Sequence, residues 1–255
     1  MAERILGAQL YTVRDYLKND EQFIETLTKI KNIGYKSAQL SCFPGLTPEG
    51  IAAAVKETGV KIDFTHIGGD QIVADPMKVI AEHAVYGCSD IGLGGGPGNM
   101  ADIADYTEFI AKMKKPLEVF KENGVHFLYH NHSKEFQRFD GKWGIELLIE
   151  GLDPDVFGIT FDVYWAAHAG VDPAKFIRKY GSSIRALHLK DMCVINNESL
   201  MAEVCTGNLD FDDILDAAEK AGVKYYEVEL DTPRIDPFES LKISHDNVKA
   251  RYDFK

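Results

Sequence analysis

The feature that most constrains this chain is a recurring junction in which a helix-like stretch ends at a glycine and an apolar run follows at once. The pattern is clearest in the segments NIGYK, ETGVK, ENGVH and KAGVK, around Gly34, Gly59, Gly124 and Gly222. A glycine just past a helix supplies the left-handed conformation that closes it, and a short β-branched or aromatic run is typical of a buried strand. Three further glycines occupy similar positions with weaker flanks: Gly87, Gly151 and Gly181.

Eight apolar runs separated by helix-like stretches are the predicted strands. They cover residues 5–11, 36–40, 61–67, 90–93, 126–130, 157–162, 184–189 and 224–229. The intervening helices begin at cap residues or first-turn prolines, namely Asp20, Thr47-Pro48, Asp75-Pro76 and Asp172-Pro173. Pro116 interrupts the helical pattern IAKMKKPLEVF, and we expect it to kink or divide that helix.

Eight strand-helix units of about 30 residues predict a parallel (β/α)8 barrel, the TIM barrel, formed by one domain over residues 1–255. An open doubly wound sheet is the alternative. It would need a glycine-rich phosphate loop after the first strand, and the segment Gln9-Leu10-Tyr11-Thr12 has no glycine. The glycine cluster GLGGGPG, residues 92–98, follows the fourth strand instead. We expect a tight turn there, and the alternative is that its backbone N–H groups face a ligand.

Charge and composition exclude several classes of protein. The chain of 255 residues has 28 basic and 40 acidic residues, a formal net charge of -12, which weighs against a nucleic-acid partner. The start MAERILGAQLYTVRDY offers neither a signal-peptide core nor a membrane span. The four cysteines are too few and too far apart for a disulfide scaffold: Cys42, Cys88, Cys193 and Cys205. We therefore expect a cytoplasmic protein without a membrane partner.

Metal-ligating side chains end four consecutive predicted strands. His130, Asp162, His188 and Glu229 each terminate an apolar run, so strand alternation places them at comparable heights. Their inward partners two residues earlier are Leu128, Thr160, Ala186 and Glu227. Taken singly, each ligand candidate could be structural, but together they predict a site for one divalent ion at the catalytic end of the barrel. Mn²⁺, Co²⁺, Zn²⁺, Fe²⁺ or Mg²⁺ fits such a site better than Ca²⁺, which prefers an all-oxygen shell.

Other polar and aromatic residues lie near the same strand ends. The candidate substrate contacts are Gln9, His66, Asn131, His132 and Trp165. Trp165 and Phe136 could form an aromatic wall for a sugar ring or belong to the core. Lys190 could hold a substrate oxygen as an electrostatic clamp, or merely pair with Asp191. His132 and Glu135 are candidates for orienting the metal ligands, because a metal-bound histidine usually donates its other N–H to a neighbouring group. His168 has no assigned role.

The chain resembles the sugar phosphate isomerase/epimerase family of xylose-isomerase-like barrels. The matching segments are LYTVRD, YHNHSKEF, FDVYWAAHAGVDP, LHLKD and YYEVELD, in the family's order across nearly the whole chain. The resemblance implies a barrel with one divalent metal bound by strands five to eight, where Asp162, His188 and Glu229 fall on ligand positions. The strand-five position is commonly Glu in the epimerases, and His130 stands there. Gln39 also replaces a frequent Glu, and Cys205-Thr206 interrupts a segment that is often Gly-Glu-Gly.

The function expected from these residues and the resemblance is a metal-dependent isomerase or epimerase of a small sugar or keto-sugar. Glu229 is the candidate base that removes a proton beside a carbonyl, giving an enediolate, with His130 as acid/base partner or ligand and Lys190 as the clamp. The alternatives are a dehydratase of a keto-sugar or keto-inositol, a carbohydrate-binding barrel without catalysis, and an endonuclease of abasic DNA. Relatives in the family are often dimers or tetramers, so a homo-oligomer is a further expectation.

Overall fold

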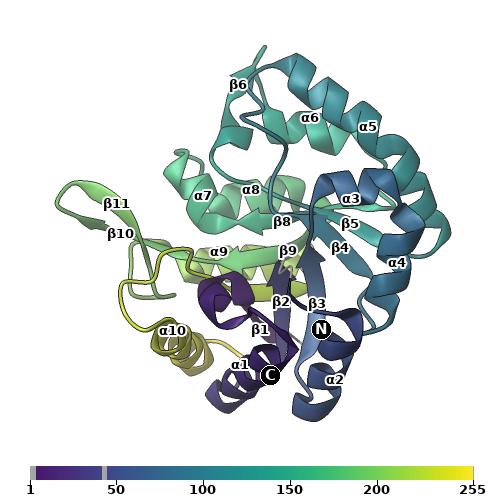
Figure 1. The fold of residues 1–255 in the computed structure, drawn as a ribbon. Coiled ribbons are helices and arrows are strands. Elements are labelled where there is room, and N and C mark those ends of the chain that lie inside the picture. Colours follow the sequence, from purple (N-terminus) through teal and green to yellow (C-terminus); the bar gives the residue numbers. More distant parts are fainter. Residues whose placement is uncertain (1–3, 42–44, 255) are drawn as a thin grey trace.

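Eight parallel strands close into a barrel in the computed structural model, which describes residues 4–41 and 45–254. The wall consists of β1 (Leu6–Gln9), β2 (Ser37–Ser41), β3 (Lys61–His66), β4 (Asp90–Leu93), β5 (His126–His130), β8 (Phe157–Asp162), β9 (Ile184–Leu189) and β12 (Tyr225–Val228). Their order is β1-β12-β9-β8-β5-β4-β3-β2, and β1 pairs with both β2 and β12 (Figure 1). The predicted (β/α)8 barrel is therefore confirmed, and the open doubly wound sheet is wrong.

Helices follow the strands and cover the outside of the wall (Figure 1). The α-helices are α1 (Asp20–Ile33), α2 (Pro48–Thr58), α3 (Gly69–Ala74), α4 (Pro76–Ala84), α5 (Ile103–Glu122), α6 (Gly144–Gly151), α7 (Val163–His168), α8 (Pro173–Tyr180), α9 (Phe211–Ala221) and α10 (Pro237–Arg251). Short 3-10 helices are η1 (Leu10–Tyr16), η2 (Lys134–Phe136) and η3 (Gly181–Ser183). None of the helices in the described part of the chain is both long enough and apolar enough to span a membrane.

Three of the four predicted helix starts are confirmed. The side chains of Thr47, Asp75 and Asp172 cap α2, α4 and α8, and a proline follows each of them. The first helix differs, because Asn19 rather than Asp20 accepts the capping hydrogen bond. The carboxylate of Asp20 instead accepts hydrogen bonds from the amide and hydroxyl of Thr47, at 2.9 and 2.6 Å, and so ties α1 to the start of α2.

Five of the seven glycine junctions have the expected left-handed backbone: Gly34, Gly59, Gly87, Gly124 and Gly222. Gly151 and Gly181 differ, since the first is the last residue of α6 and the second has a right-handed conformation with η3 continuing after it. Pro116 does not divide its helix, because α5 runs through it as one element of 20 residues. The first strand was predicted to run to residue 11, but β1 ends at Gln9. The side chain of Gln9 caps η1, which begins at Leu10.

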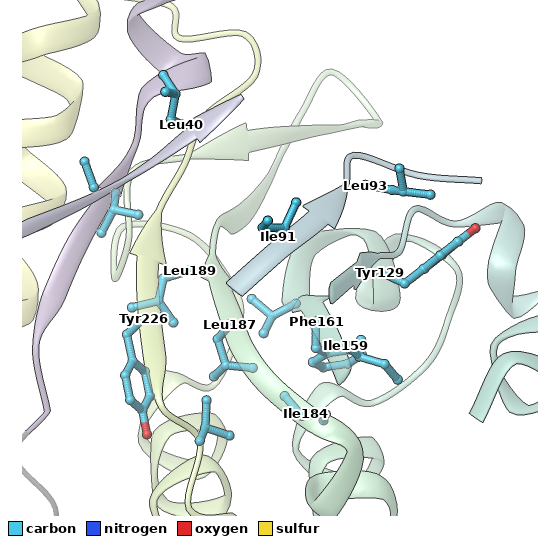
Figure 2. Packing of buried hydrophobic residues seen from close by; sticks show 14 of the residues in the cluster. Leu40, Ile91, Leu93, Tyr129, Ile159, Phe161, Ile184, Leu187, Leu189 and Tyr226 are labelled. Atoms are coloured by element: carbon cyan, nitrogen blue, oxygen red, sulfur yellow. The ribbon is translucent and has the colours of Figure 1, made fainter. Parts of the chain in front are cut away.

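Strand alternation separates two apolar layers. Phe64, Leu128 and Ala186 pack together inside the barrel, with Tyr225 against them. Because side chains alternate along a strand, the neighbouring residues point the other way and belong to the larger core. Figure 2 labels four of them, Leu187 and Leu189 from β9 and Ile159 and Phe161 from β8. The last inward-facing side chains of the strands therefore lie at the C-terminal end of the barrel, above this inner layer.

Two small antiparallel sheets stand outside the barrel wall. One pairs β6 (Arg138–Phe139) with β7 (Lys142–Trp143), and the other is a hairpin of β10 (Asp191–Ile195) and β11 (Glu198–Ala202) that projects from the barrel (Figure 1). Asn196 and Asn197 form the hairpin turn with positive φ angles, which suits an antiparallel ribbon. Cys88, Cys193 and Cys205 are free thiols, and Cys42 lies outside the described residues.

Candidate functional site

The four predicted metal ligands lie together at the C-terminal end of the barrel. His130, Asp162 and His188 belong to β5, β8 and β9, and Glu229 directly follows β12. Each offers one ligand atom, and these four atoms all lie within 4.8 Å of one another. All four side chains are buried. The alternation of the four strands thus assembles a cluster of two imidazoles and two carboxylates.

Both imidazoles are held so that one ring nitrogen faces the carboxylates. His188 Nε2 lies 2.5 Å from Gln39 Oε1, and its Nδ1 lies 2.9 Å from Glu229 Oε2. His130 Nδ1 lies 3.2 Å from the carbonyl oxygen of Gly94, and its Nε2 lies 3.3 Å from Asp162 Oδ2. Because each outer nitrogen has an oxygen acceptor, each ring is oriented as metal-bound histidines usually are.

Lys190 inserts its ammonium among the carboxylates of this cluster. Its Nζ lies 2.9 Å from Asp162 Oδ2, 2.8 Å from Glu229 Oε2 and 3.0 Å from Asp231 Oδ1. The side chain is fully buried. The alternative pairing of Lys190 with Asp191 is not found, since Asp191 instead accepts hydrogen bonds from backbone amides.

Charge balance in the cluster sets the pKa values. Burial alone would raise the pKa of Asp162 and Glu229, but the charge of Lys190 and the neighbouring imidazoles hold both pKa values well below the ordinary range. Burial would lower the pKa of His188, whereas the charge of Glu229 and the hydrogen bond to Asp162 raise it to about 9. The same carboxylates raise the pKa of Lys190 above its ordinary value against the effect of burial. Asp162, Glu229, His188 and Lys190 therefore stabilise one another in their charged forms.

A cavity of about 350 Å³ opens beside the cluster. Its lining residues are Gln9, Tyr11, Ser41, His66, Gly94, His130, His132, Glu229 and Asp231. Burial and the neighbouring imidazoles lower the pKa of His66, and burial with His130 lowers that of His132 to about 3. Both rings are neutral near pH 7, so they can donate and accept hydrogen bonds.

Three of the predicted substrate contacts line this cavity, and two do not. Gln9, His66 and His132 face it. The side chain of Asn131 is committed to the backbone of Asp162, accepting from its N–H at 3.0 Å and donating to its carbonyl at 3.3 Å. Trp165 is not among the lining residues, and its ring centre lies 5.3 Å from that of His132.

The other residues of the predicted surroundings have structural partners. Phe136 packs in the core, with ring centres 5.6 Å from Phe176 and 6.5 Å from Phe161, and does not line the cavity. Glu135 accepts hydrogen bonds from the hydroxyl of Tyr129 and the amide of His132, both at 2.7 Å. It therefore fixes the loop after β5 rather than an imidazole of the cluster.

Several cavity residues were not singled out from the sequence as contacts. Tyr11, Ser41 and Asp231 line the cavity, and burial together with the charge of Glu229 raises the pKa of Asp231 to about 6. A signal for Asp231 was available, because it lies two residues after Glu229 and strand alternation puts both on one side. Gln39 lies in the predicted strand 36–40, but nothing in the sequence around it predicts its contact with His188 across the barrel.

The donor set could hold a divalent transition metal, which would displace the proton that the carboxylates favour on His188. His130 Nε2, His188 Nδ1, Asp162 Oδ2 and Glu229 Oε2 are the atoms that converge, and mixed imidazole and carboxylate ligation suits Mn²⁺, Fe²⁺, Co²⁺ or Zn²⁺. The cavity then gives a small ligand access to one side of the cluster. Such an arrangement supports chemistry at a carbon beside a carbonyl, where negative charge must be stabilised.

Comparison with known proteins finds relatives by sequence and by structure. An inosose dehydratase of Bacillus cereus is 27% identical over 171 residues, which cover 64% of this chain and 52% of that protein. The chain thus spans about half the length of the curated relatives it matches. A sugar phosphate isomerase/epimerase structure from Parabacteroides distasonis superimposes with a TM-score of 0.85 at 22% identity, covering 100% of this chain and 96% of the other.

A second solved structure, an L-ribulose 3-epimerase, superimposes with a TM-score of 0.73 at 15% identity and covers 97% of this chain and 94% of that one. At these identities the structural matches show the fold alone. The family model described as the xylose isomerase-like TIM barrel matches residues 27–251, most of the chain, and the predicted family is thereby confirmed. The protein belongs to the xylose isomerase-like TIM barrel family.

Proposed function

We propose that the protein is a divalent-metal-dependent isomerase or epimerase that acts on a small sugar or keto-sugar through an enediolate. The observation that carries the proposal is the convergence of two oriented imidazoles and two carboxylates beside a cavity of about 350 Å³. A cavity of this size suits a ligand of a few carbon atoms with hydroxyl groups. The curated dehydratases and the solved epimerase add support, since their substrates belong to this class.

His130, Asp162, His188 and Glu229 would hold the metal. When bound, a divalent ion stabilises the negative charge that develops on the carbonyl oxygen of the substrate. Lys190 keeps Asp162 and Glu229 ionised through its contacts of 2.9 and 2.8 Å, so both remain ligands at neutral pH. Gln39 and the Gly94 carbonyl aim the two imidazoles.

Proton transfer falls to the side chains on the cavity wall. Glu229 is the proposed base, because its carboxylate lines the cavity and is held as an anion. A second group must return the proton at the other carbon or face, and His130 and Asp231 both line the same wall. A nitrogen that ligates a metal cannot carry the proton at the same time. If His130 is a ligand, Asp231 is the one of these two groups that can act as the acid/base group.

The test measures solvent deuterium exchange into candidate keto-sugars. Glu229→Gln removes the proposed base while keeping the shape of the side chain, so we expect exchange and turnover to be abolished and the circular dichroism spectrum to be unchanged. Glu118→Gln, at an exposed position on α5, is the matched control and should retain normal exchange. Near-normal exchange in Glu229→Gln would contradict the assignment of the base.

A dehydratase is the second candidate, favoured by the inosose dehydratases among the relatives. It would form the same enediolate and then expel a hydroxyl group from the adjacent carbon, protonated as it leaves. Asp231, with its raised pKa, lies on the cavity wall where such an acid would be needed. Formation of an enone or diketone, seen by its ultraviolet absorption, would identify the dehydratase, whereas an epimeric product identifies the isomerase class.

A further inference from the structure

We propose that the cavity selects an uncharged polyhydroxy ketone and discriminates against substrates that carry a phosphate or carboxylate group. This inference rests on the proposed function and narrows its substrate class. Among the described residues, the cavity wall contains no Lys or Arg, and its anionic members are Glu229 and Asp231. Residues 42–44, outside the described ranges, are Cys-Phe-Pro and carry no cationic side chain.

The uncharged part of the wall suits hydroxyl groups. Gln9, Tyr11 and Ser41 present an amide, a phenol and a hydroxyl, and His66 and His132 add two rings that donate and accept hydrogen bonds. Carboxylates accept hydrogen bonds from hydroxyl groups as well, so Glu229 and Asp231 are compatible with a polyol. A phosphate dianion has no hydrogen to donate to Asp231 and would be repelled by its charge.

The basic side chains near this end of the barrel are already engaged. Arg14 Nη1 donates to the carbonyl oxygens of Tyr11 and Asp231, at 2.9 and 3.0 Å. Lys134 Nζ donates to the carbonyls of Gly96 and Gly98, at 3.0 and 2.7 Å. Lys190 is enclosed by its three carboxylates.

The backbone amides that hold phosphate in many TIM barrels are occupied by the protein's own carboxylates. Phosphate sites in this fold are frequently formed by the loops after the seventh and eighth strands and a helix N-terminus. After the seventh strand, β9, Asp191 accepts hydrogen bonds from the amides of Met192, Gly207 and Leu209, at 2.7, 2.8 and 3.1 Å. The Asp191 carboxylate therefore already binds the amides that a phosphate group would need in this loop.

The start of α10, which follows the eighth strand, is filled in the same way. Asp236 accepts hydrogen bonds from the amides of Phe238 and Glu239, both at 3.0 Å. A substrate phosphate at either place would have to displace a carboxylate that is covalently part of the chain.

The glycine cluster after β4 has part of its backbone bound to the protein itself. The N–H of Gly96 donates to the hydroxyl of Tyr129 at 2.8 Å, and the carbonyl of Gly94 faces His130. The carbonyls of Gly96 and Gly98 are bound by Lys134. Three carbonyl oxygens of this loop and the amide of Gly96 are therefore already bound within the protein.

Asp231 is the residue to which we assign the discrimination. Its side chain lines the cavity, retains 22% exposure and lies beside Lys190, so it is the accessible negative charge that an entering anion meets. Asp231→Asn removes this charge with little change of shape. Asp216→Asn, on the outer helix α9 where Asp216 pairs with Lys220, is the matched control.

The experiment compares D-fructose with D-fructose 6-phosphate, and D-ribulose with D-ribulose 5-phosphate, on the Mn²⁺-loaded protein. Calorimetry gives the affinities and deuterium exchange gives the chemistry. We expect each free ketose to bind at least about 10-fold more tightly than its phosphate ester. Asp231→Asn should reduce that ratio by about 3-fold or more, and Asp216→Asn should leave it unchanged.

The outcomes separate this inference from the proposed function. Tighter binding of the phosphate esters with exchange into them overturns the inference and leaves the proposed function standing. Preference for the free ketoses without exchange supports the inference on binding and counts against the proposed chemistry. Binding of none of the four sugars overturns the inference, and an unchanged ratio in Asp231→Asn contradicts the assignment to that residue.

Discussion

Single side chains at the cluster use one polar atom to fix their position and another to face the site. Asp162 is the clearest case, because its Oδ1 accepts the amide hydrogen of Trp165 at 3.0 Å and so caps α7, while its Oδ2 faces Lys190. His188 divides its ring nitrogens in the same way between Gln39 and the carboxylates. The geometry of the site therefore depends on residues that never face the cavity.

Gln39→Met tests this dependence at one residue. The substitution keeps the length of the side chain but removes the acceptor 2.5 Å from His188 Nε2, so the ring loses the bond that aims Nδ1. We expect the affinity for Mn²⁺ to fall about 10-fold to 100-fold, measured by calorimetry. Gln137→Met, at an exposed position, is the control, and unchanged affinity in Gln39→Met would show that the bond does not orient the ligand.

The sequence was sufficient for residues whose position follows from alternation along one strand. His130, Asp162, His188 and Glu229 were found because each ends an apolar run. Contacts between strands that are far apart in the sequence could not be predicted. An example is the contact of Gln39 on β2 with His188 on β9. Proximity in sequence was misleading for Lys190, whose partners come from other strands rather than from the adjacent Asp191.

Elements were predicted well where their signals are local. The ends of β4, β5, β8 and β9 agree with the predicted ranges, because each of these strands coincides with a short apolar run. The differences arise where a neighbouring element competes. Gln9 caps η1 with its side chain and so ends β1 early, and η3 continues from Gly181 where a left-handed stop was expected.

The close packing of β4 against β5 gives a prediction for one element. A Cβ added at Gly92 would overlap the backbone carbonyl oxygen of Leu128, which cannot move without shifting the barrel wall. Gly92→Ala should therefore reduce the free energy of unfolding by about 1–3 kcal/mol, measured by urea denaturation. In Gly68→Ala the nearest atoms lie 3.6 Å away, so this control should change little; equal losses in the two variants would contradict the packing argument.

Ion pairs and a hydrogen bond link β4 to β9 and β12 at the end of the barrel opposite the cluster. Asp90, at the start of β4, bonds Arg185 at 3.1 Å, Lys224 at 2.9 Å and the hydroxyl of Tyr225 at 2.6 Å, which come from β9 and the start of β12. Burial alone would raise the pKa of Asp90, but the hydrogen bonds from Tyr225 and Lys224 and the two cationic charges hold it below its ordinary value.

This lowered pKa makes stability depend on pH in a defined direction. The ionised Asp90 stabilises the fold above the ordinary carboxyl pKa of about 4, and that contribution is lost as the pH falls through the lower pKa of the folded state. Asp90→Asn should reduce the free energy of unfolding by about 2 kcal/mol at pH 7, and the gap from wild type should shrink at pH 3. Urea denaturation at both pH values measures the gap, and a gap that is equal at both would rule out the ionised carboxylate as its source.

The pairing of β1 with β12 also determines when the barrel of a nascent chain can close. Leu6 lies opposite Tyr226, so the wall stays open until the eighth strand has emerged, and Glu229 follows that strand by one residue. Closure of the barrel and completion of the four-residue cluster are therefore a single late event. Until then β1 and β9 present unpaired edges, which makes a chain halted before β12 prone to edge-to-edge association.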